Sequence, residues 1–229
     1  MALQEELQKE VKSIFQKTWD HEKATTIPEL DDLRLNSNHA KELGNPVVLY
    51  ADIDGSTSMV EGLRWSRAAE VYKAYLRCAS EIIRNEGGTI TAYDGDRVMG
   101  VFLSDTPNTD AVRAALKING AVINIINPAF KAQYSDSAFV LKHVVGVYGS
   151  TLRVAKIGVH GDNDLVWVGT AANYAAKLCT LGQPPTWIGE SVYKNMKDET
   201  RLSNGTNMWQ TKTWNNVTVY CSTYYWKTI

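Results

Sequence analysis

The spacing of apolar residues divides the chain into helices and strands that follow one another in a mixed order. Apolar residues recur every three or four positions over residues 3–20, 59–86 and 109–126, which predicts three amphipathic helices. Shorter helices are expected over residues 169–181 and 190–196. Strands are expected where apolar residues run or alternate over short segments, at 47–53, 89–93, 97–103, 139–148, 152–157, 165–168 and 187–188, with two closing strands after residue 207.

Glycine and proline residues punctuate these elements. Gly87-Gly88 ends the helix over residues 59–86, and Pro128 is expected to stop the helix that begins at 109. Residues 25–45 are polar and contain Pro28, which indicates a connecting segment with one short helix. The resulting β-α-β-β-α-β order predicts an α+β fold with a ferredoxin-like core. We therefore expect an N-terminal helix and connector over residues 1–45 and one domain over 46–229, with the helix either covering that domain or pairing with a second copy.

Composition narrows the classes of partner. The net charge of −1 gives no basic surface for nucleic acid, so no nucleic-acid partner is expected. No run of eighteen apolar residues occurs, and the charged N-terminus does not resemble a secretory signal, so no membrane partner is expected. The three cysteines are widely separated, which is typical of free thiols in a reducing compartment. These features predict a cytoplasmic protein.

Two aspartates at strand ends carry the candidate chemistry. The apolar run VVLYA ends in Asp52 and Asp54, followed by Gly55-Ser56-Thr57, and such a turn of small residues suits a metal-bound phosphate. Asp96 follows the hairpin turn signal Asp94-Gly95, where it can point toward the same place as Asp52. A pair of such carboxylates is typical of two-metal phosphoryl chemistry. Asp94-Gly95 alone is equally typical of an ordinary hairpin turn.

Three motifs in order resemble those of class III nucleotidyl cyclases. They are Asp52-Ile53-Asp54-Gly55-Ser56-Thr57, the segment GDRVMGVF over residues 95–102, and the segment GTAANYAAK over residues 169–177. The resemblance extends over roughly residues 46–188 and implies the same ferredoxin-like core.

The resemblance assigns roles to the residues of the first two motifs. It implies that Asp52 and Asp96 bridge two divalent cations, Mn²⁺ or Mg²⁺, with the Ile53 carbonyl oxygen as a further ligand. Asp54 falls on a variable position of the family and is left out of the metal set. The backbone N–H groups of residues 55–57 (Gly55, Ser56 and Thr57) are expected to hold the β- and γ-phosphates of a nucleoside triphosphate. The alternative for Asp52 is a strand-end residue that caps the next helix.

The third motif implies a shared active site. Asn173 and Lys177 are four residues apart, on one face of a helix. The family places there an asparagine that orients the ribose and an arginine that stabilises the pentavalent phosphate; Lys177 keeps the charge and loses the bidentate fork. Family sites form between two chains, so one chain carrying all motifs implies a homodimer with two equivalent sites. The alternative for Lys177 is a solvent-facing helix residue.

Base recognition is where the chain departs from the purine cyclases. Ala92 and Val166 occupy the positions at which adenylyl cyclases read the adenine edge, and neither side chain can hydrogen-bond. Tyr50 shares the strand face of Asp52 and is expected to favour a small base, although it is also typical of a core aromatic residue. These departures resemble the pyrimidine cyclases of bacterial Pycsar anti-phage systems, whose product activates a separate cyclic-nucleotide-binding effector. UTP is favoured over CTP by the resemblance, and no residue is assigned to distinguish the O4 oxygen of uracil from the N4 amino group of cytosine.

Alternatives to the uridylate cyclase remain open. One is a cytidylate cyclase, or an adenylyl cyclase that reads its base through backbone groups or water. The others are an inactive cyclase-like nucleotide-binding module and an unrelated ferredoxin-like protein whose acids are structural. Retention of Asp52, Asp96 and Asn173 argues against the inactive module.

Overall fold

The structure is a computed structural model that describes residues 3–227, and its chain forms two compact units. One unit combines Met1–Gly44 with Thr151–Gly169, and the other combines Asn45–Ser150 with Thr170–Ile229. The division expected from the sequence, 1–45 and 46–229, stays a prediction about domains. The compact units differ from it in one segment, because the hairpin over residues 151–169 groups with the N-terminal residues.

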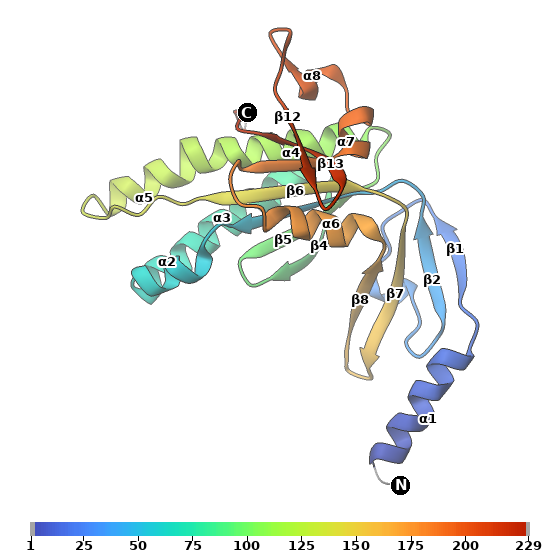
Figure 1. The fold of residues 1–229 in the computed structure, drawn as a ribbon. Coiled ribbons are helices and arrows are strands. Elements are labelled where there is room, and N and C mark those ends of the chain that lie inside the picture. Colours follow the sequence, from blue (N-terminus) through green and yellow to red (C-terminus); the bar gives the residue numbers. More distant parts are fainter. Residues whose placement is uncertain (1–2, 228–229) are drawn as a thin grey trace. The chain divides into compact units, whose positions relative to one another are not determined.

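A seven-stranded sheet forms the centre of the larger unit, in the order β12-β13-β9-β6-β3-β5-β4. Only β6 and β9 pair in parallel; the other neighbours are antiparallel. The run β4-β5-β3-β6 has the strand order of the predicted ferredoxin-like core, and the α+β fold class is confirmed (Figure 1). The strands are β3 (Val47–Ile53), β4 (Thr89–Asp94), β5 (Arg97–Phe102), β6 (His143–Gly149), β9 (Thr186–Gly189), β12 (Gln210–Trp214) and β13 (Val217–Ser222).

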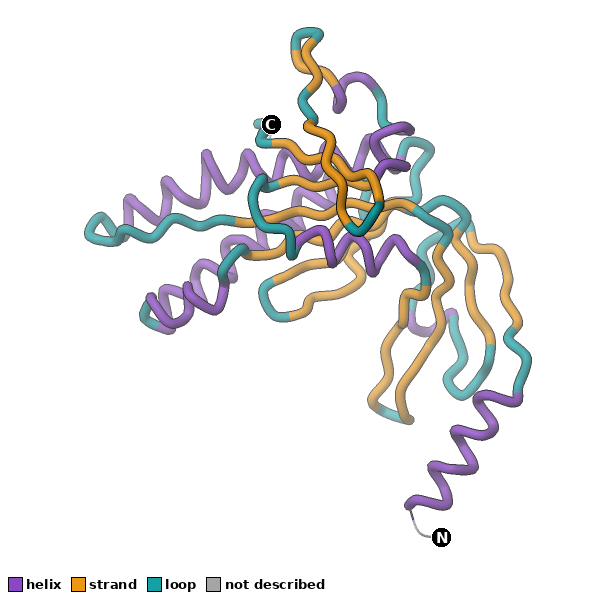
Figure 2. Tube along the Cα trace, in the orientation of Figure 1, coloured by secondary structure: helices purple, strands orange, loops and turns teal. Residues whose placement is uncertain are grey.

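Helices cover both faces of this sheet (Figure 2). On one face, Leu49 and Ala51 of β3 pack with residues of α3 (Trp65–Asn85) and α4 (Pro107–Ala121) in the main core. On the other face, Tyr50 packs with Leu178 and Cys179, which come from α6 (Thr170–Cys179) or lie at its end. The strand is therefore covered on both sides, which is why it reads as a nearly continuous apolar run. The unit also contains α7 (Glu190–Asn195), α8 (Asp198–Arg201), β10 (Leu202–Ser203) and β11 (Thr206–Asn207).

The helix expected over residues 59–86 is two helices. The first, α2 (Ser56–Gly62), ends where the Leu63 N–H bonds the Met59 carbonyl oxygen, and α3 begins at Trp65. Leu63 has an extended backbone, with φ −108° and ψ 153°, so the chain changes direction directly after Gly62, the last residue of α2. Apolar spacing alone does not reveal such a break.

Pro128 does not stop the second long helix, so that expectation is wrong. After α4 the chain continues through a π-helical segment, η2 (Val122–Ile126), into α5 (Asn127–Gln133). Pro128 lies in the first turn of α5, where a missing N–H is tolerated. The wider π turn lets the helix pass the proline ring.

The smaller unit contains a four-stranded sheet in the order β1-β2-β7-β8. The segment over residues 25–45, expected to be a connector, holds the predicted short helix and also a strand, so the connector expectation is wrong for β2. That strand buries Ala40 and Leu43, and its charged Glu42 pairs with Arg153 of the next strand. The elements are α1 (Leu3–Gln16), β1 (Asp20–Ala24), η1 (Leu30–Asp32), β2 (His39–Leu43), β7 (Leu152–Val159) and β8 (Asp162–Val168).

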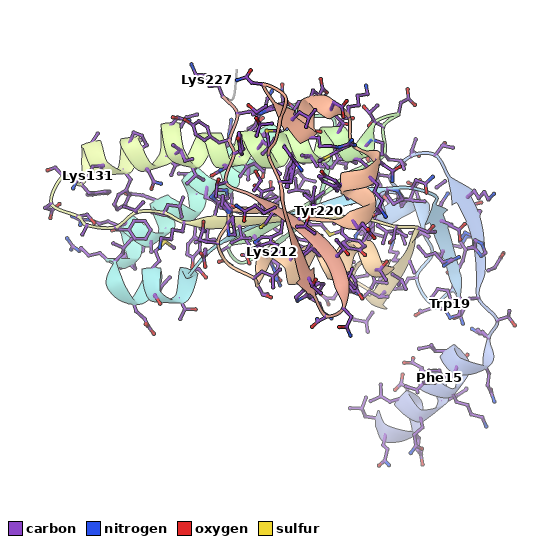
Figure 3. All side chains as sticks on the ribbon, turned by 45° about the horizontal axis from the view of Figure 1, so that its top comes forward. Phe15, Trp19, Lys131, Lys212, Tyr220 and Lys227 are labelled. Atoms are coloured by element: carbon purple, nitrogen blue, oxygen red, sulfur yellow. The ribbon has the colours of Figure 1, made fainter. Side chains whose placement is uncertain are left out.

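Helix α1 ends at Gln16, four residues before its expected end. None of its described residues is buried, and its apolar stripe is exposed; Phe15, labelled in Figure 3, is 85% exposed. Pairing with a second copy stays a prediction.

Helix α6 lies unusually close to the sheet because of Gly146 in β6. A Cβ atom at Gly146 would lie 2.1 Å from the Ala175 carbonyl oxygen and 2.9 Å from the Leu178 Cβ atom. Backbone oxygen cannot move aside as a flexible side chain can, so only glycine allows this approach. Gly146 therefore fixes the height of α6, the helix that carries Asn173 and Lys177, above the sheet.

We predict that Gly146→Ala destabilises the protein by about 1–3 kcal/mol, because overpacking forces α6 away from β6. Urea unfolding measures the change. Gly149→Ala in the same strand is the matched control, since its nearest contact would be an ordinary 3.4 Å to Val47 Cγ2; it should cost less than about 0.5 kcal/mol. Equal losses in the two variants would contradict the close approach of α6.

Candidate active site

The pairing of β3 with β5 brings Asp52 beside the β4–β5 turn. Ala51 lies opposite Val98 in this antiparallel register, so the next pair outward is Asp52 and Arg97. Asp96 directly precedes Arg97, in a turn that needs the left-handed backbone of Gly95, with φ 62°. The structure thus places the two predicted metal aspartates at the ends of adjacent strands.

The negative charge of Asp96 acts on the Asp52 carboxylate, which agrees with their expected proximity. Burial, and secondarily the negative charge of Asp96, raises the pKa of Asp52 from its ordinary 3.8 to about 6. The Arg97 guanidinium and an N–H bond from Ile53 act in the opposite direction. A partly buried carboxylate with a second negative charge nearby forms a site that a divalent cation would neutralise. The residues present therefore fit the predicted metal.

Tyr75 of α3 holds the backbone of Asp52 through a hydrogen bond. From the sequence, Tyr75 was expected only to belong to the apolar face of a helix. The Tyr75 hydroxyl donates to the Asp52 carbonyl oxygen at 3.2 Å. Burial raises the pKa of Tyr75 well above its usual range, so the group stays a donor. The ring of His143 lies 5.9 Å away, and burial lowers the pKa of His143 to about 3, which keeps it neutral. Tyr75 and His143 are therefore both neutral and add no charge beside Asp52.

The turn after β3 presents backbone N–H groups at the start of α2. Gly55 has a left-handed backbone, with φ 76°, and its added Cβ would meet nothing within 4 Å. Thr57 is exposed and Ser56 is half-buried, so the predicted phosphate-binding turn is accessible. Asp54, which was left out of the metal set, accepts a hydrogen bond from Gln183 Nε2 at 3.2 Å. That bond ties the turn to the loop before β9.

Asn173 and Lys177 lie one turn apart on the exposed side of α6. Their neighbours Ala172, Ala175 and Leu178 face the sheet and are buried. Within residues 3–227, neither Asn173 nor Lys177 makes a side-chain hydrogen bond or ion pair, with Asp52, Asp96 or any other residue. The structure exposes these two groups and does not join them to the acids of the same chain.

Of the three residues expected to select the base, Tyr50 and Ala92 lie on one face of the same sheet. Tyr50 lies opposite Met99, and Met99 lies opposite Ala92, so these residues share one face of the sheet. Burial raises the pKa of Tyr50, which keeps its hydroxyl protonated. Arg97, for which no role was predicted, places its guanidinium carbon 5.9 Å from the centre of the Tyr50 ring. Val166 lies on β8, in the other unit.

A cation at the two aspartates needs further ligands from elsewhere. In the part of the chain that the structure describes, no group of three or more His, Cys, Asp or Glu side chains converges on a possible metal position. Mg²⁺ is commonly held by one or two carboxylates together with substrate phosphates and water, so this composition suits a site completed by its substrate.

Among the described helices, none has the length and apolar character needed to cross a membrane.

Comparison with known proteins shows full-length relatives. No protein-family model matches the chain. It is 52% identical over 227 residues to a uridylate cyclase of Burkholderia cepacia, with 99% of each chain covered. It is 48% identical over 230 residues to a uridylate cyclase of Xanthomonas perforans, again with 99% of each covered. An adenylate cyclase of Anabaena cylindrica is 28% identical over 65% of this chain and 30% of its own.

Solved structures of cyclases share the fold. The guanylyl cyclase Cya2 superimposes with a TM-score of 0.68 at 18% identity, covering 82% of this chain and 95% of its own. The adenylyl cyclase CyaB from P. aeruginosa gives a TM-score of 0.64 at 21% identity, covering 83% and 98%. At these identities the likeness shows the fold alone, and it agrees with the cyclase-type catalytic fold expected from the motifs.

The raised pKa of Asp52 predicts how stability depends on pH. The folded protein binds this proton more tightly than the unfolded chain, so the metal-free protein is penalised as pH rises from about 4 through 6. We predict that Asp52→Asn removes the penalty, which is about 1–2 kcal/mol after allowance for solvent screening. Urea unfolding in a metal chelator should show this gain at pH 8 and none at pH 4.

The exposed Asp136 offers a control, since Asp136→Asn removes the same charge from a solvent-exposed turn outside the candidate site. It should change the free energy of unfolding little at either pH. A gain in Asp52→Asn that is the same at both pH values, or absent at pH 8, would contradict the raised pKa of Asp52.

Proposed function

The chain belongs to the uridylate cyclase family of class III nucleotidyl cyclases, and we propose that it converts UTP into 3′,5′-cyclic UMP and diphosphate. The ribose 3′-oxygen forms a bond to the α-phosphorus, the bond from that phosphorus to the bridging oxygen breaks, and the 3′-hydroxyl proton is lost. The observation that carries the proposal is the pair of interacting carboxylates, Asp52 and Asp96, in a chain with two full-length uridylate cyclase relatives.

Asp52 and Asp96, with the Ile53 carbonyl oxygen, would hold two divalent cations, Mn²⁺ or Mg²⁺. When bound, such cations acidify the attacking hydroxyl and neutralise the triphosphate. Asp52 must be ionised to act as a ligand, and its pKa of about 6 means that this state dominates near neutral pH. Below that pH, a cation that binds would displace the proton from the Asp52 carboxyl group.

The remaining groups bind the nucleotide. The N–H groups of Gly55, Ser56 and Thr57 would donate to the β- and γ-phosphates, aided by the start of α2. Asn173 would orient the ribose, and the Lys177 ammonium would stabilise charge on the α-phosphate. Lys177 acts as a point charge and lacks the planar fork of arginine, so we expect a lower rate than an arginine there would give.

A second copy of the chain would complete each site. In the described residues of one chain, Asn173 and Lys177 are exposed and touch neither aspartate. A two-fold homodimer would set these groups of one protomer against the aspartates of its partner, and symmetry would create two equivalent sites.

Base choice would depend on space and hydrogen bonding beside Tyr50. The half-buried Tyr50 ring occupies the sheet face shared with Ala92, which leaves less room for a purine. A clash in a packed site is strongly discriminating, whereas the wrong pyrimidine loses only a hydrogen bond. CTP is therefore the second candidate substrate, ahead of ATP.

We place the product in anti-phage signalling, as the resemblance to the pyrimidine cyclases of Pycsar systems implies. Cyclic UMP would act as a second messenger read by a separate protein with a cyclic-nucleotide-binding domain. Cyclic UMP that accumulates in infected cells is the observable that this role requires.

We predict that the pure protein with Mn²⁺ makes cyclic UMP faster than any other cyclic nucleotide when ATP, GTP, CTP and UTP compete. Chromatography with mass detection identifies the products. Tyr50→Phe should narrow the preference between the pyrimidines by removing the hydroxyl, and Tyr50→Ala should admit ATP by opening space. Asp96→Ala should make no product while keeping the fold.

Faster turnover of ATP than of UTP by the wild type would contradict the pyrimidine assignment. An unchanged product spectrum in Tyr50→Ala would remove the role given to Tyr50. If no triphosphate is converted although the protein binds nucleotide, the chain is the inactive module.

We predict that two inactive variants rescue each other when their chains are mixed. In an Asp52→Ala and Lys177→Ala heterodimer, one site collects both defects and the other collects none. Random mixing makes half the dimers mixed, so activity should reach up to about a quarter of wild type. Absence of rescue, with subunit exchange shown by native mass spectrometry, would place each site within one chain.

A further inference from the structure

We propose that Arg97 reads the uracil base, donating a hydrogen bond to its O4 oxygen and so selecting UTP over CTP. This inference rests on the proposed function, and it supplies a second group, beside the Tyr50 hydroxyl, that separates UTP from CTP.

Strand register places Arg97 on the face that carries Tyr50. Directly opposed residues of paired strands project to the same side, and Tyr50 opposes Met99 while Ala92 opposes Met99 from the other strand. Arg97 is two residues from Met99 along β5 and opposes Asp94, so its side chain shares that face. The 5.9 Å between its guanidinium carbon and the Tyr50 ring centre agrees with this placement.

The guanidinium is held in place and keeps donors to spare. Asp94 Oδ2 accepts from Arg97 Nε at 3.1 Å and also from Nη2. Within the described residues, Nη1 has no hydrogen-bond partner. The side chain is 36% exposed, so a ligand can reach it. An arginine clamped at one edge presents its other edge with little loss of freedom on binding.

The chemistry of the two bases gives the discrimination. Guanidinium donates hydrogen bonds and accepts none. Uracil presents a carbonyl oxygen at position 4, which accepts, whereas cytosine presents an amino group there, which donates. Arg97 facing cytosine would therefore oppose donor to donor and leave its own N–H groups unpaired. The small Ala92 side chain beside it leaves room for a pyrimidine edge.

A phosphate contact is the alternative role for an arginine near a metal centre, and the two roles make different predictions. Every nucleoside triphosphate carries the same phosphates, so loss of a phosphate ligand lowers kcat/KM for UTP and CTP alike. Loss of a base contact lowers it for UTP alone.

The test measures kcat/KM for UTP and for CTP in the wild type, Arg97→Met and Arg97→Lys, in the full-length protein with Mn²⁺. Arg97→Met keeps the length of the side chain and removes its donors. We expect the value for UTP to fall by about 10- to 100-fold and that for CTP to stay within about threefold. Arg97→Lys keeps a cationic donor and loses the planar fork of arginine. Its ratio of kcat/KM for UTP to kcat/KM for CTP should therefore lie between those of the wild type and Arg97→Met.

Arg77→Met is the matched control, because Arg77 is 77% exposed on α3, where it pairs with Glu81. It should leave both values unchanged. Thermal unfolding checks that each variant is folded. If Arg97→Met does not fold, the comparison is made with Arg97→Lys.

The outcomes separate the two proposals. An equal fall for UTP and CTP, or an unchanged ratio, in a wild type that makes cyclic UMP overturns the role of Arg97 and leaves the proposed function standing. A wild type that makes no cyclic UMP overturns the proposed function itself. A wild type that prefers CTP overturns both.

Discussion

The placement of the partly buried Asp52 beside Asp96 is the constraint on which the rest of the site depends. The register of β3 with β5 holds the two carboxylates together, and burial strengthens their interaction by reducing solvent screening. The neutral Tyr75 hydroxyl donates to the Asp52 carbonyl oxygen, and the Arg97 guanidinium offsets part of the negative charge on the Asp52 side chain. A fold that holds two acids in this way gives up some stability without metal and offers a strong site when a cation arrives.

The second constraint is the close approach of α6 to β6 over Gly146. It positions Asn173 and Lys177 on a rigid helix while leaving both exposed to solvent. One chain thus presents acids at the strand ends and polar groups on the helix. In the proposed mechanism each set is an incomplete half-site, and a second copy of the chain would supply the other half.

Much of this was accessible from the sequence, and the exceptions have physical reasons. Asp52 and Asp96 were predictable because a strand end and a hairpin turn are local signals. Arg97 was not, because its relation to Tyr50 depends on strand register, which apolar alternation does not fix. The strand β2 was missed because its charged residues pair across strands, and the continuation of the helix at Pro128 was missed because a π turn has no sequence signature.

We propose that Asp52 and Asp96 together form a cation site that the nucleotide completes. Electron paramagnetic resonance of free Mn²⁺, titrated into protein holding a non-hydrolysable UTP analogue, counts the bound ions directly. The account predicts two tightly bound Mn²⁺ per nucleotide in the wild type and loss of tight binding in Asp52→Asn and Asp96→Asn, with Asp136→Asn unchanged. Tight binding of two ions that survives in either of the first two variants would contradict it.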